Sequence, residues 1–174
     1  MNSKFEENLP DSFVLDLDGV FTDGKFAYSK KGKISKSFGP DDHDALKFLK
    51  RYLKIHVVTA DSKGFEISHR RLKVDMNLPL NLVRAEERRN WICERFDVKK
   101  LIYMGDGLLD ILVFREVMYS ITPANALDST KNEASYVTKA KGGDRAIAEA
   151  SLHILDKFFG VDLDDFLSKF LPYN

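Results

Sequence analysis

The chain has 174 residues, of which 44% are hydrophobic and 31% charged, a length and mixture typical of a globular protein with a sizeable buried core. Lys and Arg together number 27, as do Asp and Glu, so the zero formal net charge gives no electrostatic reason to expect a nucleic-acid or membrane partner. The single cysteine, Cys93, excludes an intramolecular disulfide, and residues 1–10 lack the apolar core of a signal peptide, which predicts a cytoplasmic location.

Segments with the patterns of strands and helices alternate along the chain. In order, the sequence predicts a strand from residue 13, a β-hairpin over about 22–39, a helix from 40, a strand over 55–61, a helix over 64–73, a strand over 80–83, a helix over 86–96, a strand over 100–104, a helix to about 116, a strand over 118–122, a short helix after 123, a strand over 135–138 and a helix from 142. This alternation predicts an α/β fold, a doubly wound and mostly parallel sheet with a hairpin insertion after the first strand. We expect one domain over residues 1–174, with a helical tail over about 161–174 that begins at the N-cap candidate Asp162.

The first strand carries two acidic residues where it ends. Asp16 and Asp18 are two residues apart, so in a strand their side chains point in the same direction. One interpretation is a strand end with solvated carboxylates. The other is a functional pair, because a divalent cation offsets the repulsion, and two carboxyl groups with different pKa values suit acid–base chemistry. The first strand alone leaves both interpretations open.

Two later strands also end in residues that carry chemistry. One ends in Thr59 and Asp61, and another is followed by Asp106 and, one helical turn later, by Asp110. The carboxyl ends of parallel strands meet at one edge of a sheet, so we expect these side chains to lie near Asp16. Carboxylates from two strands suit Mg²⁺, and Thr59 with backbone amides suits phosphate oxygens. The sequence therefore predicts a site for phosphoryl transfer.

Three of these segments resemble motifs of the haloacid dehalogenase (HAD) superfamily, namely residues 16–20 (DLDGV), Thr59 and residues 105–110 (GDGLLD). Residues 18–24 (DGVFTDG), followed by the hairpin, more narrowly resemble the 3-deoxy-manno-octulosonate 8-phosphate phosphatase family. That subclass has no cap domain and includes the phosphatase-like domain of sialic acid cytidylyltransferases. The resemblance extends over about residues 13–156 and implies a Rossmann-like HAD fold.

The resemblance implies a Mg²⁺-dependent phosphatase that hydrolyses the phosphate monoester of a small sugar or sugar acid, such as 3-deoxy-octulosonate 8-phosphate or a nonulosonate 9-phosphate. It implies that Asp16 is the nucleophile that forms an aspartyl-phosphate, and that Asp18 protonates the leaving oxygen and later activates water. The implied metal-site residues are Asp16, Asp18 through its backbone carbonyl, Asp106, and Asp110 as the residue that orients the others. The family also implies a homotetramer in which a neighbouring subunit covers the active site.

The third motif of the superfamily is usually a lysine just before a helix, and this stretch has none. Arg88 fits that role best because apolar residues follow it at helical spacing, and Arg84 and Arg89 are its rivals. The predicted catalytic residues are Asp16, Asp18, Thr59 and Arg88. The residues predicted to bind phosphate or substrate are Thr59, Ala60, Gly19, Arg88 and His43.

The chain departs from the octulosonate enzymes outside the third motif as well. Ala60 and Asp61 stand where those enzymes typically carry Gly and Arg, Ala148 stands where they carry Arg, and His43 replaces a Gly. Arginine is a typical ligand of anions, so these departures leave the particular sugar phosphate open.

Two other functions are compatible with the motifs. A degenerate, non-catalytic oligomerisation module would keep the fold without turning over a substrate, and the changes at Asp61, Ala148 and the third motif keep this alternative open. A receiver-type domain would accept a phosphoryl group on an aspartate, but receivers do not carry a second acid two residues later, as Asp18 is here.

Two minor features complete the prediction. Lys30, Lys31 and Lys33 form a basic tip of the hairpin that we expect to be solvated. Cys93 falls within an apolar helical segment, so we expect a buried, inert thiol.

Overall fold

A computed structural model describes residues 9–168 of the chain. The elements within these residues are β1 (Ser12–Asp16), β2 (Ala27–Ser29), β3 (Gly32–Ser35), α1 (Asp42–Leu49), β4 (Lys54–Thr59), α2 (Phe65–His69), the π-helix η2 (Arg70–Asp75), β5 (Leu80–Leu82), α3 (Arg88–Arg95), the 3-10 helix η3 (Val98–Lys100), β6 (Leu101–Met104), α4 (Asp110–Phe114), β7 (Tyr119–Thr122), α5 (Asp128–Glu133), β8 (Tyr136–Val137), α6 (Ala146–Phe159) and α7 (Leu163–Ser168).

Within the described residues, six strands form one sheet in the order β5-β4-β1-β6-β7-β8, and every neighbouring pair is parallel. The first strand, β1, lies at the centre between β4 and β6, with Asp16 opposite Val58 and Leu15 opposite Met104. The strand order reverses its direction at β1, and ligands of open parallel sheets bind at such a point, beyond the carboxyl ends of the strands. The predicted doubly wound parallel sheet is confirmed.

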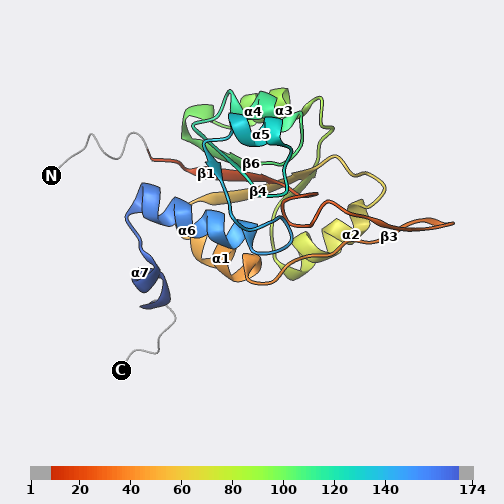
Figure 1. Cartoon of the computed structure of the whole chain (residues 1–174), viewed down its shortest axis with the longest axis horizontal. Helices are drawn as coiled ribbons and strands as arrows, with labels where there is room; N and C mark the ends of the chain where they lie inside the picture. Colours follow the sequence, from red (N-terminus) through yellow and green to blue (C-terminus); the bar gives the residue numbers. More distant parts are fainter. Residues whose placement is uncertain (1–8, 169–174) are drawn as a thin grey trace.

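Helices cover both faces of the sheet, as Figure 1 shows for α1 and α6 on one side and α3, α4 and α5 on the other. The alternation of side chains along β1 supplies both cores, because Phe13 and Leu15 pack with residues of α1 and α6 while Val14 packs with Ile92 and Val113 on the opposite face. A strand buried on both faces needs apolar side chains on both of them, which explains the continuous apolar run from Phe13 to Leu15.

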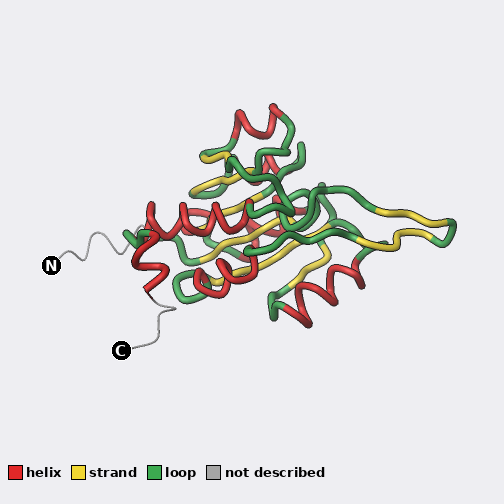
Figure 2. Tube along the Cα trace, turned by 60° about the horizontal axis from the view of Figure 1, so that its bottom comes forward, coloured by secondary structure: helices red, strands yellow, loops and turns green. Residues whose placement is uncertain are grey.

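The predicted hairpin is present and lies outside the sheet. Strands β2 and β3 pair antiparallel, and an isolated bridge between Thr22 and Phe38 closes the base of the hairpin. The hairpin extends away from the body of the molecule in both views (Figures 1 and 2). Tyr28 and Ile34 are more than half exposed on it, so its tip presents apolar side chains to the surroundings.

Two predictions about helices need correction, and a third is confirmed. The helix expected over 64–73 is a short α-helix that continues as the wider η2. Cys93 is exposed, so its predicted burial is wrong: Ile92 and Arg88, one turn apart, are the residues of α3 that face the interior of the protein, and Cys93 lies on another side of the helix. Asp162 accepts a hydrogen bond from the Asp165 amide at 2.8 Å, as predicted for the N-cap of α7.

Residues 169–174 of the predicted tail, and most of the polar N-terminal stretch, lie outside the described residues. Among those that are described, no helix is long and apolar enough to cross a membrane.

Asp42 joins the first and last long helices of the fold. Its Oδ1 atom accepts a hydrogen bond at 3.0 Å from the amide of Ala148, in the first turn of α6. Its buried Oδ2 atom has no hydrogen-bond partner among the described residues. Burial raises the pKa of Asp42 to about 6 from its ordinary value of 3.8, because the charged carboxylate is poorly compensated there.

Replacing Asp42 with Asn tests this linkage. The folded protein binds the Asp42 proton more tightly than the unfolded chain does, so the contribution of Asp42 to wild-type stability falls as pH rises from about 4 to about 6 and is constant above that range. The Asp42→Asn variant keeps the oxygen that accepts from Ala148 and does not titrate. Relative to the wild type, its free energy of unfolding in urea should rise by on the order of 2 kcal/mol between pH 4 and pH 7. A constant difference between the two proteins would contradict the assignment.

Candidate active site

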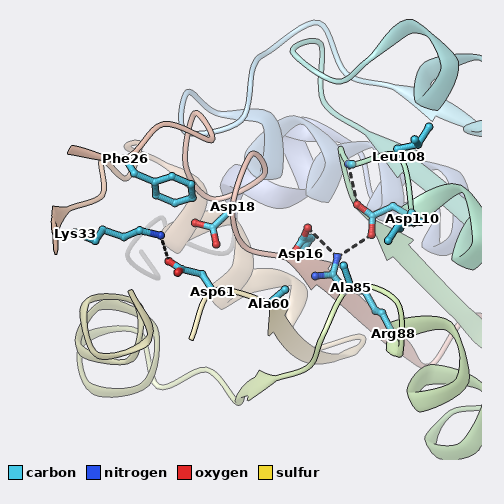
Figure 3. Close-up of a pocket in the computed structure, with 12 residues that line it drawn as sticks. Asp16, Asp18, Phe26, Lys33, Ala60, Asp61, Ala85, Arg88, Leu108 and Asp110 are labelled. Carbon is cyan, nitrogen blue, oxygen red and sulfur yellow. Dashed lines mark hydrogen bonds and ion pairs between the residues drawn. The ribbon is translucent and has the colours of Figure 1, made fainter. Parts of the chain in front are cut away.

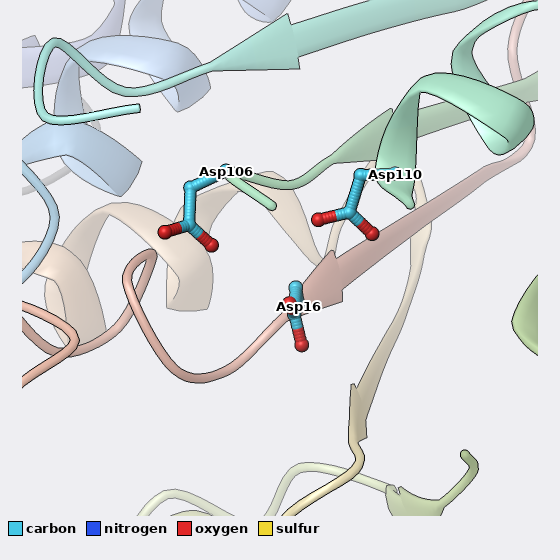
Figure 4. A group of neighbouring side chains, drawn as sticks. All are labelled: Asp16, Asp106 and Asp110. Atoms are coloured by element: carbon cyan, nitrogen blue, oxygen red, sulfur yellow. The ribbon is translucent and has the colours of Figure 1, made fainter. Parts of the chain in front are cut away.

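The acidic residues predicted at the strand ends lie together at the carboxyl edge of the sheet. Asp16 is the last residue of β1, Asp106 follows β6 by two residues, and Asp110 is the first residue of α4. One carboxylate oxygen from each lies within 4.8 Å of the others (Figure 4). Asp16 and Asp110 are buried and Asp106 is half-buried, so the group opens to the surface on one side only.

Arg88, the first residue of α3, reaches this group from the neighbouring layer. Its Nη1 atom lies 2.8 Å from both Asp16 Oδ2 and Asp110 Oδ1 (Figure 3). The same atom lies 3.1 Å from the hydroxyl oxygen of Tyr103. The Tyr103 hydroxyl donates to Asp110 Oδ1 at 2.6 Å, and the amide of Gly107 donates to Asp110 Oδ2 at 2.9 Å. Both carboxylate oxygens of Asp110 are therefore engaged by protein groups, whereas the negative charge of Asp106 still calls for a compensating positive charge.

Burial and mutual repulsion perturb the acidic group. Burial raises the pKa of Asp16 to about 7, although the Arg88 guanidinium opposes the rise. Burial also raises the pKa of Asp106 to about 7, and the charges of Asp16 and Asp110 add to this effect. One buried cation thus faces three carboxyl groups. A hard divalent cation is the kind of ligand that suits such an excess of oxygen donors.

A glycine makes room for Asp106. Gly19 has a φ of 94°, and a Cβ atom at this position would lie 1.9 Å from Asp106 Oδ2. The loop that carries Gly19 is held from the far end of the sequence: its carbonyl accepts from Asn125 Nδ2 at 3.0 Å, and Asn125 Oδ1 accepts from the amide of Gly142 at 2.6 Å. A Cβ atom on Gly142 would lie 1.8 Å from the Gly19 carbonyl oxygen, so the two backbones touch.

Asp18 lies beside Asp16 but has different partners. Its Oδ2 atom accepts from the hydroxyl of Thr59 at 3.0 Å, and its Oδ1 atom lies 2.8 Å from the ammonium nitrogen of Lys36. The same ammonium lies 2.8 Å from Asp61 Oδ2, which also pairs with Lys33. The hairpin therefore contributes two lysines to the wall of the site.

A cavity of about 430 Å³ opens in front of these groups. The residues around it come from the ends of β1, β4 and β6, from the hairpin and from the segment before α3, and they include Asp16, Asp18, Phe26, Lys33, Ala60, Asp61, Ala85, Arg88, Gly107, Leu108, Leu109 and Asp110 (Figure 3). Acidic and basic groups thus lie at its base, and apolar side chains lie at its rim.

The structure brings most of the predicted site residues together and leaves others apart. Arg88 contacts the acidic group, whereas Arg84 and Arg89 are exposed and pair with Glu86 and Glu116. His43 does not line the cavity at Asp16. It lines a separate small hollow of about 10 Å³ beside Phe38 and Arg71.

Two predicted phosphate contacts are already used within the protein. The amide of Gly19 donates to the hydroxyl oxygen of Thr22 at 3.2 Å. The hydroxyl of Thr59 donates to Asp18 and accepts from the amide of Asp61. Ala60, in contrast, is exposed and lines the cavity.

The hairpin lysines were not found from the sequence. Lys33 was expected to be solvated, but its side chain is only 4% exposed and that of Lys36 is 0% exposed, so the expectation is wrong for Lys33. Nothing in the local pattern of the hairpin distinguishes these lysines from solvated ones. The one available signal was Asp61, because an acid in place of an arginine near a site calls for a compensating cation.

Comparison with known proteins agrees with the geometry of the site. The chain is 30% identical over 150 residues to 3-deoxy-D-manno-octulosonate 8-phosphate phosphatase KdsC of Haemophilus influenzae, covering 82% of this chain and 81% of that protein. A solved 3-deoxy-D-manno-octulosonate 8-phosphate phosphatase from Moraxella catarrhalis, in complex with magnesium ion, phosphate ion and a KDO molecule, has a TM-score of 0.82 at 24% identity and covers 98% of this chain and 99% of its own.

A second solved structure, the cobalt-bound deoxy-D-mannose-octulosonate 8-phosphate phosphatase of Haemophilus influenzae, has a TM-score of 0.78 at 27% identity and covers 94% of this chain and 99% of its own. No family model matches the chain. The fold and the sequence thus resemble the same group of proteins over most of their length.

Replacing Arg88 should destabilise the folded protein. An Arg88→Met variant leaves Asp16 and Asp110 buried without their cation, and breaking a buried ion pair in this way costs about 3–5 kcal/mol. The measurement is urea unfolding at pH 8 without divalent cations, where the carboxyl groups favour their charged form. Arg89→Met is the matched control, because this neighbouring arginine pairs with Glu116 at the surface and should change stability little. Equal effects of the two substitutions would contradict the buried network.

Proposed function

The chain belongs to the 3-deoxy-D-manno-octulosonate 8-phosphate phosphatase family of the HAD superfamily, and from this membership we propose that it is a Mg²⁺-dependent phosphatase of a small phosphorylated sugar or sugar acid. The observation that carries the proposal is the group of Asp16, Asp106 and Arg88 at the carboxyl edge of the sheet, with Asp18 beside it and a cavity in front. We further propose that residues 1–174 form one phosphatase domain that acts in the cytoplasm.

Mg²⁺ fits the residues present at this edge. Asp16 and Asp106 offer oxygen donors to a hard cation, and their raised pKa values reflect a local excess of negative charge that a dication offsets. In this proposal Asp16, Asp106 and the backbone carbonyl of Asp18 hold the ion, and Asp110 orients the set through Arg88 and Tyr103. When bound, Mg²⁺ supplies charge that stabilises the phosphoryl oxygens in the transition state.

Asp16 is the proposed nucleophile and Asp18 the proposed acid and base. A carboxylate oxygen of Asp16 forms a bond to phosphorus as the bond from phosphorus to the sugar oxygen breaks, and the proton of Asp18 passes to that leaving oxygen. Asp18, now a carboxylate, then takes a proton from water as the water oxygen bonds to phosphorus. The bond from phosphorus to Asp16 breaks, inorganic phosphate leaves, and Asp18 is again protonated.

Arg88 and Thr59 support these two residues in the proposal. Arg88 holds Asp16 Oδ2, so the nucleophile is fixed at the base of the cavity. The buried Arg88 Nε atom has no hydrogen-bond partner among the described residues, which leaves a donor for a phosphate oxygen or a water molecule. Thr59 holds Asp18 at the neighbouring strand end. Ala60 lines the cavity where its exposed backbone can meet the substrate.

Phosphate release by the purified protein tests the proposal. The wild type should release inorganic phosphate in the presence of Mg²⁺ from at least one ester of a panel that contains 3-deoxy-octulosonate 8-phosphate, nonulosonate 9-phosphates and hexose phosphates. Asp16→Asn, which removes the nucleophile with little change in shape, should lower kcat by at least about 10³-fold. Chelation with EDTA should abolish turnover in the wild type. A folded wild type that hydrolyses no member would favour a non-catalytic assembly module instead.

We also propose a homotetramer in which a neighbouring subunit covers the cavity. The exposed Tyr28 and Ile34 on the projecting hairpin, and the exposed Leu108 and Leu109 at the cavity rim, support this assembly because apolar side chains so placed favour association. Light scattering coupled to size-exclusion chromatography should give four times the mass of the 19.9 kDa chain. A Tyr28→Ser, Ile34→Ser double variant should give a smaller species, and a wild-type monomer would contradict the proposal.

A further inference from the structure

Lys36 is a completely buried cation to which the proposed mechanism assigns no role. It lies just after β3 in the hairpin, and its side chain is 0% exposed. Its ammonium nitrogen lies 2.8 Å from each of three acceptors, Asp18 Oδ1, Asp61 Oδ2 and Ser68 Oγ. The contact with Ser68 is a hydrogen bond, whereas the contacts with the two carboxylates are ion pairs, and Asp18 Oδ1 has no hydrogen-bond partner among the described residues. Lys36 is therefore engaged by two carboxylates at the edge of the site.

Asp61 completes a closed ring of contacts around Asp18. Its Oδ2 atom forms an ion pair with Lys36, and its Oδ1 atom accepts a hydrogen bond from the amide of Gly64 at 3.0 Å. Its own amide donates at 3.1 Å to Thr59 Oγ1, and that hydroxyl donates to Asp18 Oδ2. Asp18 is thus held at one oxygen by Lys36 and at the other by Thr59, and Asp61 fixes both of these partners.

We propose that Lys36, anchored by Asp61, is a positioning residue that fixes the carboxyl group of Asp18 for proton transfer to the leaving oxygen. This inference rests on the proposed phosphatase function. A carboxylate has about four acceptor sites, so the contacts with Lys36 and Thr59 leave sites free. Asp18 also keeps 19% of its side chain exposed and lines the cavity, so the group is both held and accessible to a substrate.

Lys33 provides an internal comparison. It comes from the same hairpin and pairs with the same oxygen of Asp61, but it lies over the ring of Phe26, and among the described residues it makes no ion pair or hydrogen bond with Asp18. Removing the charge of Lys33 therefore perturbs the hairpin and Asp61 while it leaves the direct hold on Asp18 in place. A difference in activity between the Lys36 and Lys33 variants therefore reflects the positioning of Asp18.

The basicity of the leaving group distinguishes positioning of an acid from general damage to the site. A sugar alkoxide is a strong base and needs a proton as it leaves, whereas p-nitrophenolate is a weak base and leaves without one. Misplacing Asp18 should slow hydrolysis of a sugar phosphate much more than hydrolysis of p-nitrophenyl phosphate. A loss of metal binding, nucleophile or fold would slow both.

The experiment compares kcat and KM for p-nitrophenyl phosphate with those for the panel ester that the wild type hydrolyses fastest. Lys36→Met should lower kcat for the sugar ester by about 10²-fold, the scale of a misplaced catalytic group, with a much smaller change for p-nitrophenyl phosphate and little change in either KM. Lys36→Arg should restore part of the loss because it returns a cation. Asp61→Asn should shift the ratio of the two kcat values in the same direction, and Lys33→Met should leave that ratio unchanged.

The outcomes separate this inference from the function on which it rests. A wild type that hydrolyses neither ester overturns the proposed function and this inference with it. A wild type that is active, combined with equal losses on both esters in Lys36→Met or with no loss, overturns the inference alone. If circular dichroism shows that Lys36→Met is unfolded, Lys36→Arg and Asp61→Asn decide, and an unchanged ratio in both overturns the positioning role.

Discussion

The contact of Arg88 with two buried carboxylates is the interaction on which the candidate site depends. Strands β1 and β6 are neighbours in a parallel sheet, so their carboxyl ends bring Asp16 close to Asp106 and Asp110 despite the repulsion between their negative charges. Like charges at such separations repel strongly away from water. Arg88 offsets part of this repulsion and fixes Asp16 and Asp110, and the remaining negative charge attracts a cation or a proton.

The fold and the charged side chains make different contributions to the candidate site. The parallel sheet brings the strand ends to one edge. Gly19 leaves room there, because a side chain at this position would occupy the position of the Asp106 carboxylate. The cations then come from outside the central strands, with Arg88 from α3 and Lys36 from the hairpin. Asp16 and Asp18, which are two residues apart, consequently have separate environments: Asp16 lies beside Arg88 and two other carboxylates, and Asp18 is held by a lysine and a threonine.

The sequence predicted the features that depend on local pattern and on topology. Alternating apolar segments indicated the parallel sheet, and the position of Asp16, Asp106 and Thr59 at strand ends was enough to place them at one edge. Helical spacing favoured Arg88, and the structure has Arg88 beside Asp16 and Arg89 at the surface, because only one face of α3 meets the sheet. The roles of these residues in catalysis remain predictions.

What could not be predicted depends on contacts between distant segments. Lys33 and Lys36 resemble solvated hairpin lysines until Asp61, 28 residues after Lys33, is known to lie against them. Cys93 was misplaced because it follows the apolar residues Trp91 and Ile92, and only the orientation of α3 decides which of its residues are buried. His43 is the second residue of α1, and the first turn of this helix faces a different hollow from the one at Asp16.

The touching backbones of Gly19 and Gly142 also have a consequence for biosynthesis. A ribosome makes the strand that carries Asp16 early, but the loop after it is braced by Asn125 and Gly142, which emerge more than a hundred residues later. Contacts between such distant segments form late, since the intervening chain must first be ordered. The nascent protein therefore carries Asp16 for most of its synthesis without the residues that brace the loop after it, and it gains an assembled site only as its last third folds onto its first.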